Sequence, residues 1–138
     1  MSGDLSIFTD GGARGNPGPA AIGVVVKNRQ GKTIHQFGRT IGETTNNVAE
    51  YQAVISALEW LCSRPQADQP EAVNFYIDST LIVHQIKGEW KIKLPHLRQL
   101  VERAHQLEPK LIAITYTVIP REKNADADAL VNQALDKC

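Results

Sequence analysis

Four acidic side chains are the residues best suited to chemistry in this 138-residue sequence. Asp10 and Asp78 each follow an apolar run typical of a strand, whereas Glu50 and Asp128 lie in the first turns of segments with helical periodicity. In open α/β sheets, the carboxyl ends of strands and the neighbouring helix N-termini converge at one edge. Four acids gathered there repel one another unless a cation neutralises them, and all-oxygen ligands favour Mg²⁺ or Mn²⁺. We therefore expect a divalent metal site.

Each acid also has an ordinary structural interpretation. Glu50 stands three residues after Asn47, which is the spacing of a capping box, and Asp78 is placed to cap the helix that follows it. Asp126 and Asp128 both lie in the first turn of a helix, where negative charge is favourable. For any one acid the structural interpretation is the more frequent one, whereas the four together favour a metal site.

The elements that must position these acids can be predicted from apolar periodicity and turn residues. Strands are expected at 5–9, 21–27, 32–41, 72–77 and 111–119. Helices are expected at 47–62, 79–87, 95–108 and 124–137. This order predicts an α/β fold whose five-stranded mixed sheet has three antiparallel and then two parallel strands, with helices on both faces.

A glycine- and proline-rich stretch, 11–20, follows the first acid. Glycines let main-chain amides approach a ligand closely, and Arg14 and Asn16 are side chains that suit a phosphodiester. The alternative is an ordinary hairpin in which Asp10 caps the turn. The stretch alone leaves both interpretations open.

Composition limits the class of protein. Acids and bases balance at 15 each, so any nucleic-acid surface must be local, and 42% hydrophobic residues suit one globular domain over 1–138. No apolar run is long enough to cross a membrane and no signal peptide is evident, so we expect a monomeric cytoplasmic protein. Cys62 and Cys138 form neither a disulfide framework nor a zinc set; free thiols are expected, with a bridge between them as the alternative.

Five short motifs, taken together, resemble those of the type 1 ribonuclease H family. They are TDGG at 9–12, GNPGP at 15–19, TTNNVAE at 44–50, IDS at 77–79 and NxxADxL at 124–130. They occur in the family's order and cover essentially the whole chain, which is far more specific than any one motif.

The resemblance implies an endonuclease that hydrolyses the RNA strand of an RNA–DNA hybrid with two bound ions, Mg²⁺ or Mn²⁺. It implies that Asp10 bridges both ions and that Asp128 holds the ion that activates water. Glu50 and Asp78 would then serve the ion nearer the leaving oxygen. Such a pair of ions stabilises both the attacking and the leaving oxygen of an in-line displacement.

The resemblance also assigns residues to the substrate. Asn16, Thr45 and Asn46 would hold the nucleic-acid backbone, although turn and cap chemistry explains the same residues and both roles are compatible. Gly11 and Gly12, with Asn16, are placed to read the 2′-hydroxyl that only RNA offers.

The chain departs from many family members in two places. The loop at 118–124 holds no histidine, as in compact archaeal-type members, and Arg121 can bind a phosphate but cannot act as a base. A long lysine-rich insertion is also absent. A candidate backbone-binding patch takes its place, formed by Trp90 with Lys87, Lys91 and Lys93 around it; the alternative is a solvated turn with Trp90 anchored in the core.

Other functions are compatible with the same fold. The nearest is a different nuclease, such as an exonuclease or a resolvase, and duplex RNA is a further candidate substrate. A catalytically silent hybrid-binding module is the alternative from another class. Such a module would tolerate loss of its acids, yet all four positions are acidic here.

Overall fold

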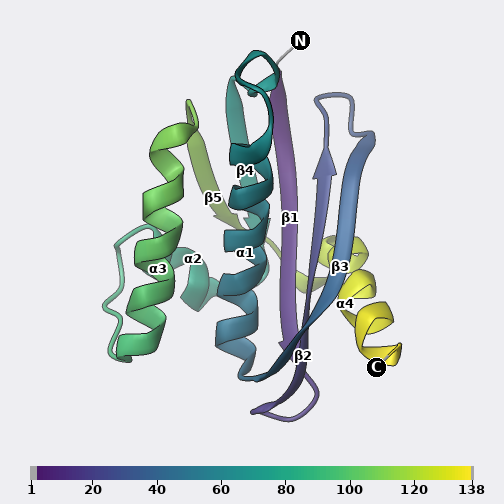
Figure 1. Cartoon of the computed structure of the whole chain (residues 1–138), viewed down its shortest axis with the longest axis vertical. Coiled ribbons are helices and arrows are strands. Elements are labelled where there is room, and N and C mark those ends of the chain that lie inside the picture. Colours follow the sequence, from purple (N-terminus) through teal and green to yellow (C-terminus); the bar gives the residue numbers. More distant parts are fainter. Residues whose placement is uncertain (1–2, 138) are drawn as a thin grey trace.

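The computed structural model describes residues 3–137 and contains one five-stranded sheet in the order β3-β2-β1-β4-β5 (Figure 1). The strands are β1 (Asp4–Ala13), β2 (Gly18–Lys27), β3 (Thr33–Thr44), β4 (Ala72–Ile77) and β5 (Ile114–Val118). β1, β2 and β3 pair antiparallel, while β4 pairs parallel with both β1 and β5. The predicted mixed sheet is therefore confirmed.

Helices cover both faces of this sheet, as predicted. They are α1 (Asn46–Ser63), α2 (Thr80–Ile86), α3 (Pro95–Leu107) and α4 (Ala125–Asp136), with short 3₁₀ turns η1 (Gln66–Asp68), η2 (Glu108–Lys110) and η3 (Arg121–Asn124). Figure 1 shows α1 and α3 in front of the sheet, while α4 packs against β2 and β3 from the other side. Among these described helices, none is both long and apolar enough to span a bilayer.

The main core lies between the sheet and the layer of α1, α2 and α3. Alternate residues of β4 point into it, so Val73, Phe75 and Ile77 are almost fully buried. Tyr51 and Leu58 of α1 pack against the same cluster. This core fixes the end of β4 relative to α1, and Asp78 directly follows β4 while Glu50 lies on α1.

The glycine-rich stretch is mostly strand, so the prediction that Asp10 ends its strand was wrong. β1 continues to Ala13 because it pairs antiparallel with β2 as far as Ala20. Only the parallel pairing with β4 stops beside Asp10, at Thr9. Asp10 therefore lies inside a strand, one residue beyond the last pair that β1 makes with β4.

Two glycines in the middle of strands let α4 approach the sheet. A Cβ added at Gly23 would lie 2.3 Å from the Ala127 carbonyl oxygen, and one at Gly38 would lie 2.8 Å from that of Leu130. Gly23 is directly opposite Asp10 in the pairing of β1 with β2. The missing side chains thus bring the first turn of α4 next to Asp10.

The prediction about the cysteines is tested only in part. Cys62 lies near the end of α1, where its Sγ contacts the Leu107 carbonyl at 3.5 Å. Cys138 lies outside the described residues. That the two thiols are unpaired stays a prediction.

Candidate active site

Three carboxylates from three different elements meet at the carboxyl end of the parallel strand pair. Asp10 of β1, Glu50 of α1 and Asp78 after β4 each offer an oxygen, and these oxygens lie within 4.8 Å of one another. Glu50 reaches the cluster because α1 rests directly on Gly11, where an added Cβ would lie 2.2 Å from the Ala49 carbonyl oxygen. The sequence placed these three acids at one edge, and the structure brings them together.

The cluster holds more negative charge than its surroundings can balance. Burial, the charges of Asp78 and Asp128, and a hydrogen bond shared with Asp128 together raise the pKa of Asp10 to about 8, although the Gly11 amide opposes them. Burial, followed by the charges of Asp10 and Asp78, also raises the pKa of Glu50 well above its usual value. The Gly11 amide and the charge of Arg121 lower the pKa of Glu50 only in part.

A divalent cation fits this set of donors. One carboxylate oxygen of Glu50 is buried without a hydrogen-bond partner. Carboxylate oxygens are the preferred ligands of hard cations, and a cation would relieve the repulsion that raises the pKa of Asp10. Asp10, Glu50 and Asp78 are therefore the residues of the described chain best arranged to hold a metal ion.

Asp128 lies beside these three acids and not within their cluster. It is exposed on the first turn of α4 and lines the same cavity, of about 380 Å³, as Asp10 and Glu50. Asp126, two residues earlier, instead lies 3.6 Å from the Lys27 ammonium. The two acids therefore face different neighbours, as expected from the 100° turn per residue of a helix.

Asn124 is a site residue for which the sequence alone predicts no role. It is buried, and its Nδ2 donates to the Thr9 carbonyl at 2.9 Å and to Asp78 Oδ2 at 3.1 Å. An asparagine just before a helix is usually read as a cap, yet this side chain makes no capping bond. Only the fold shows that it faces Asp78.

The residues expected to hold substrate backbone have structural roles in the free protein. Asn16 Oδ1 accepts from the Asn46 amide at 2.9 Å, and Asn46 Oδ1 accepts from the Ala13 amide at 2.8 Å. The Thr45 hydroxyl caps α1 by accepting from the Val48 amide at 3.3 Å. These bonds tie the β1–β2 loop to the start of α1, so the structural interpretation holds whatever else these residues do.

The other candidate substrate residues divide between two places. Gly11, Gly12 and Arg121 line the cavity that contains the acids. Lys87, Trp90 and Lys91, by contrast, lie in the connection between α2 and α3.

Trp90 does not serve as a core anchor, so that alternative was wrong. Its side chain is 46% exposed and stacks on the His84 ring with 4.4 Å between ring centroids. Lys87 lies 3.6 Å from Glu89, which also contacts His84 at 2.6 Å. The connection therefore presents an aromatic pair to solvent, flanked by charges of both signs.

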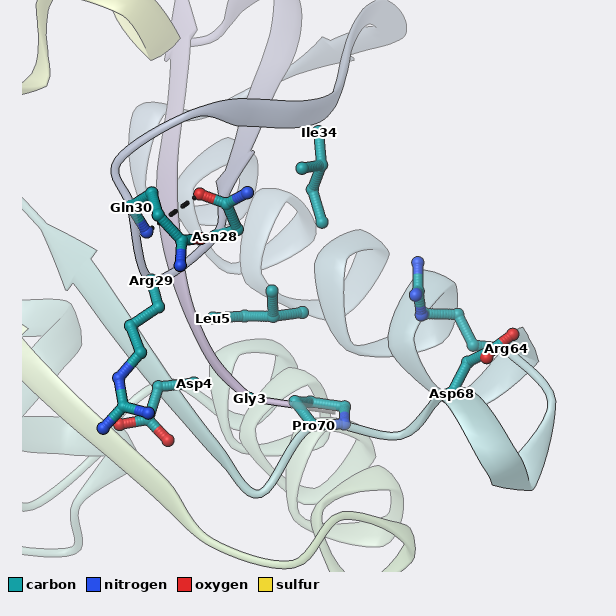
Figure 2. Close-up of a pocket in the computed structure, with 10 residues that line it drawn as sticks. All are labelled: Gly3, Asp4, Leu5, Asn28, Arg29, Gln30, Ile34, Arg64, Asp68 and Pro70. Atoms are coloured by element: carbon teal, nitrogen blue, oxygen red, sulfur yellow. Dashed lines mark hydrogen bonds between the residues drawn. The ribbon is translucent and has the colours of Figure 1, made fainter. Parts of the chain in front are cut away.

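Another cavity, of about 460 Å³, lies at the opposite end of β1 and is shown in Figure 2. It contains Asp4 and Asp68 together with Arg29 and Arg64, so charges of opposite sign are present in equal number. The Asn28 side chain there accepts from the Gln30 amide at 3.0 Å, which is ordinary turn chemistry. The clustered acids make the cavity around Asp10 the better candidate for catalysis.

Comparison with known proteins agrees with this geometry. A family profile described as "Reverse transcriptase-like" matches residues 8–134. Ribonuclease HI of Halobacterium salinarum is 40% identical over 134 residues, which cover 97% of this chain and 65% of that protein. A bifunctional protein of Mycobacterium tuberculosis is 40% identical over 131 residues, or 94% of this chain and 35% of that protein. The chain thus spans about a third to two thirds of the length of these relatives.

A solved structure matches this chain over nearly the whole length of both chains. LC11-RNase H1, in complex with an RNA/DNA hybrid, superposes with a TM-score of 0.92 and is 47% identical. The match covers 96% of this chain and 97% of that one. With this identity, this coverage and an acid cluster at the expected edge of the sheet, the chain belongs to the type 1 ribonuclease H family.

Proposed function

We propose that this protein is an endonuclease that hydrolyses the RNA strand of RNA–DNA hybrids. The observation that carries the proposal is the cluster of Asp10, Glu50 and Asp78, with Asp128 lining the same cavity as Asp10 and Glu50. A relative 47% identical over nearly its whole length was solved in complex with an RNA/DNA hybrid, which supports the substrate class.

We infer that the acids hold two ions, Mg²⁺ or Mn²⁺, for which Asp10, Glu50, Asp78 and Asp128 supply the ligands. The buried, unpartnered oxygen of Glu50 and the raised pKa of Asp10 both support cation binding. Two ions bound there would activate the attacking water and stabilise the leaving oxygen of an in-line displacement.

The remaining site residues hold and orient the substrate. Arg121 binds a phosphate, and because its guanidinium stays protonated it does not act as the base. Gly11 and Gly12 border the acids without side chains, so their backbone can lie against a ribose and its 2′-hydroxyl. Asn16 and Asn46 hold the adjoining loop against α1 and contact the substrate backbone from there.

Four further residues contact the hybrid at two other places. Trp90 offers an exposed ring for a sugar or base, and Thr45 contacts the backbone at the start of α1. Lys87 and Lys91 contribute positive charge beside Trp90. We also propose that the protein acts as a monomer in the cytoplasm and that duplex RNA is an additional substrate.

A substrate panel tests this function. Labelled hybrid, duplex RNA, duplex DNA and single strands are incubated with Mg²⁺, and the products are sized on a denaturing gel. We expect internal fragments from the RNA strand of the hybrid. Mononucleotides released from an end would indicate an exonuclease, and binding without cleavage would indicate a silent module; either result would contradict the proposal. Asp10→Asn serves as the inactive control.

A further inference from the structure

Arg14 is a charged residue of the active-site cavity that the proposed function does not use. It lies just after β1, and its Nη2 reaches the far end of α4, 2.6 Å from Asp136 Oδ1 and 3.5 Å from Asn132 Oδ1. Arg14 and Asn132 both line the cavity that holds Asp10 and Asp128. The charge of Arg14 therefore lies at the rim of the acid site, where Asp136 neutralises it.

The cavity has basic groups near both ends of α4. Among the residues lining it, Arg14 and Arg121 are the two basic ones. Arg121 precedes α4, whereas Arg14 contacts its last residue, and a helix of 12 residues is about 18 Å long. A strand whose phosphate is cut beside Asp128 extends for several nucleotides on either side. Because both arginines line the same cavity as Asp128, a backbone that lies in this cavity passes within reach of both.

We propose that Arg14 binds a phosphate of the strand that is cut, and that Asp136 holds its side chain in the free protein. The proposal rests on the proposed function and adds a substrate residue to it. The Arg14 and Asp136 side chains are 48% and 67% exposed, and such exposed ion pairs are weak and screened by salt. A phosphate can therefore displace Asp136, and the planar guanidinium matches two phosphate oxygens.

If a phosphate replaces Asp136 as the partner of Arg14, substitutions of Arg14 and of Asp136 should have opposite effects on hybrid binding. Arg14→Ala removes a phosphate contact and should weaken hybrid binding about five- to tenfold, with a salt slope smaller by about one. Asp136→Asn removes the competing carboxylate and should tighten binding. In the Arg14→Ala background, Asp136→Asn should change little, because no guanidinium remains to be released.

A purely structural role of the Arg14–Asp136 ion pair predicts different effects of the same substitutions. If the ion pair only held α4 against the β1–β2 loop, either substitution would lower the melting temperature and weaken binding in the same direction. The pair formed by Arg103 and Glu59 on α3 and α1 provides a matched control, since its side chains are 48% and 47% exposed and neither lines the cavity. Arg103→Ala and Glu59→Gln should leave hybrid binding unchanged.

Fluorescence anisotropy of a labelled hybrid, titrated in chelator over a range of KCl, measures all five variants and wild type without cleavage. Arg14→Ala that binds like Arg103→Ala, or Asp136→Asn that binds more weakly than wild type, would overturn the proposal. If wild type binds the hybrid, only the role of Arg14 is then wrong. If wild type itself does not bind, the proposed function fails and the role of Arg14 fails with it.

Discussion

Nδ2 of Asn124 lies 3.1 Å from Oδ2 of Asp78 and also donates to the Thr9 carbonyl at 2.9 Å. One buried amide thus joins the start of α4 to β1 and to an acid that follows β4. The contact orients a carboxylate of the candidate metal site, and it does so from the segment that also carries Asp128. The geometry of two of the four acids therefore depends on this side chain.

Asn124→Ala should lower both stability and turnover. It leaves a buried carbonyl without its donor, which costs about 1–3 kcal/mol of unfolding free energy. Because Asp78 also loses its orienting partner, kcat should fall more than KM rises. Asn74→Ala, on the exposed side of β4, is the control. Equal kcat in the Asn124→Ala and Asn74→Ala proteins, each measured below its melting temperature, would remove Asn124 from the site.

Asp10 should make the metal-free protein less stable as pH rises. Its pKa is raised to about 8 in the folded state, so the folded protein binds more protons than the unfolded chain above pH 3.8. The resulting stability is present below that pH and is lost as pH rises through 8. Asp10→Asn should therefore melt about as wild type does at pH 4 but at a higher temperature at pH 9, in chelator.

The difference in unfolding free energy between Asp10→Asn and wild type should be about 2 kcal/mol at pH 9. This is well below the value that the full pKa shift of Asp10 would give, because the neighbouring acids relax when one charge is removed. Thermal melting across pH measures it. A wild-type protein whose stability relative to Asp10→Asn is the same at both pH values would contradict the electrostatic account of the cluster.

Gly23→Ala should displace α4 and with it Asp128. The new Cβ would lie 2.3 Å from the Ala127 carbonyl oxygen, so helix or strand must move. We expect the free energy of unfolding to fall by about 1–3 kcal/mol. The cleavage rate should also fall, because Asp128 moves with α4. Gly12→Ala is the stability control, since its nearest contact would be 3.8 Å. If the Gly23→Ala protein melts like the Gly12→Ala protein, close packing of α4 is not essential.

Asp128 and Asp126 should respond differently to the same substitution. Asp128→Asn keeps the fold but should lose most of the activity, because the proposed metal ion loses a carboxylate ligand beside Asp10. Asp126→Asn loses only an exposed contact with Lys27 and should cost at most a few tenths of a kcal/mol. Cleavage rates and melting curves for both variants test this. Inactivity of Asp126→Asn alone would reverse the assignment.

The order of strands and helices could be predicted from the sequence because apolar periodicity and turn residues agree along the whole chain. The clustering of Asp10, Glu50 and Asp78 followed from that order, since strand ends and helix starts meet at one edge of a sheet. The ends of the elements were less predictable. β1 extends through Gly11 and Gly12 because it pairs with β2 as far as Ala20, and the missing side chain of Gly11 leaves room for the backbone of α1.

Contacts that depend on packing could not be predicted from one sequence. Gly23 and Gly38 look like ordinary glycines within strands, and only the position of α4 shows why they lack side chains. Asn124 looks like a helix cap, and Arg14 looks like a loop residue until Asp136, 122 positions later, is found beside it. In each case the partner is distant in sequence, and local patterns carry no information about it.

Cleavage of the RNA strand of a hybrid should depend on divalent ions held by the acid cluster. The most direct measurement follows cleavage of an end-labelled RNA strand in a hybrid, first in Mg²⁺, then in excess chelator, and again after Mg²⁺ or Mn²⁺ is restored. We predict internal cleavage that stops in chelator, returns with the ion and is absent in Asp10→Asn. Cleavage that persists in chelator, or that survives in Asp10→Asn, would contradict the account.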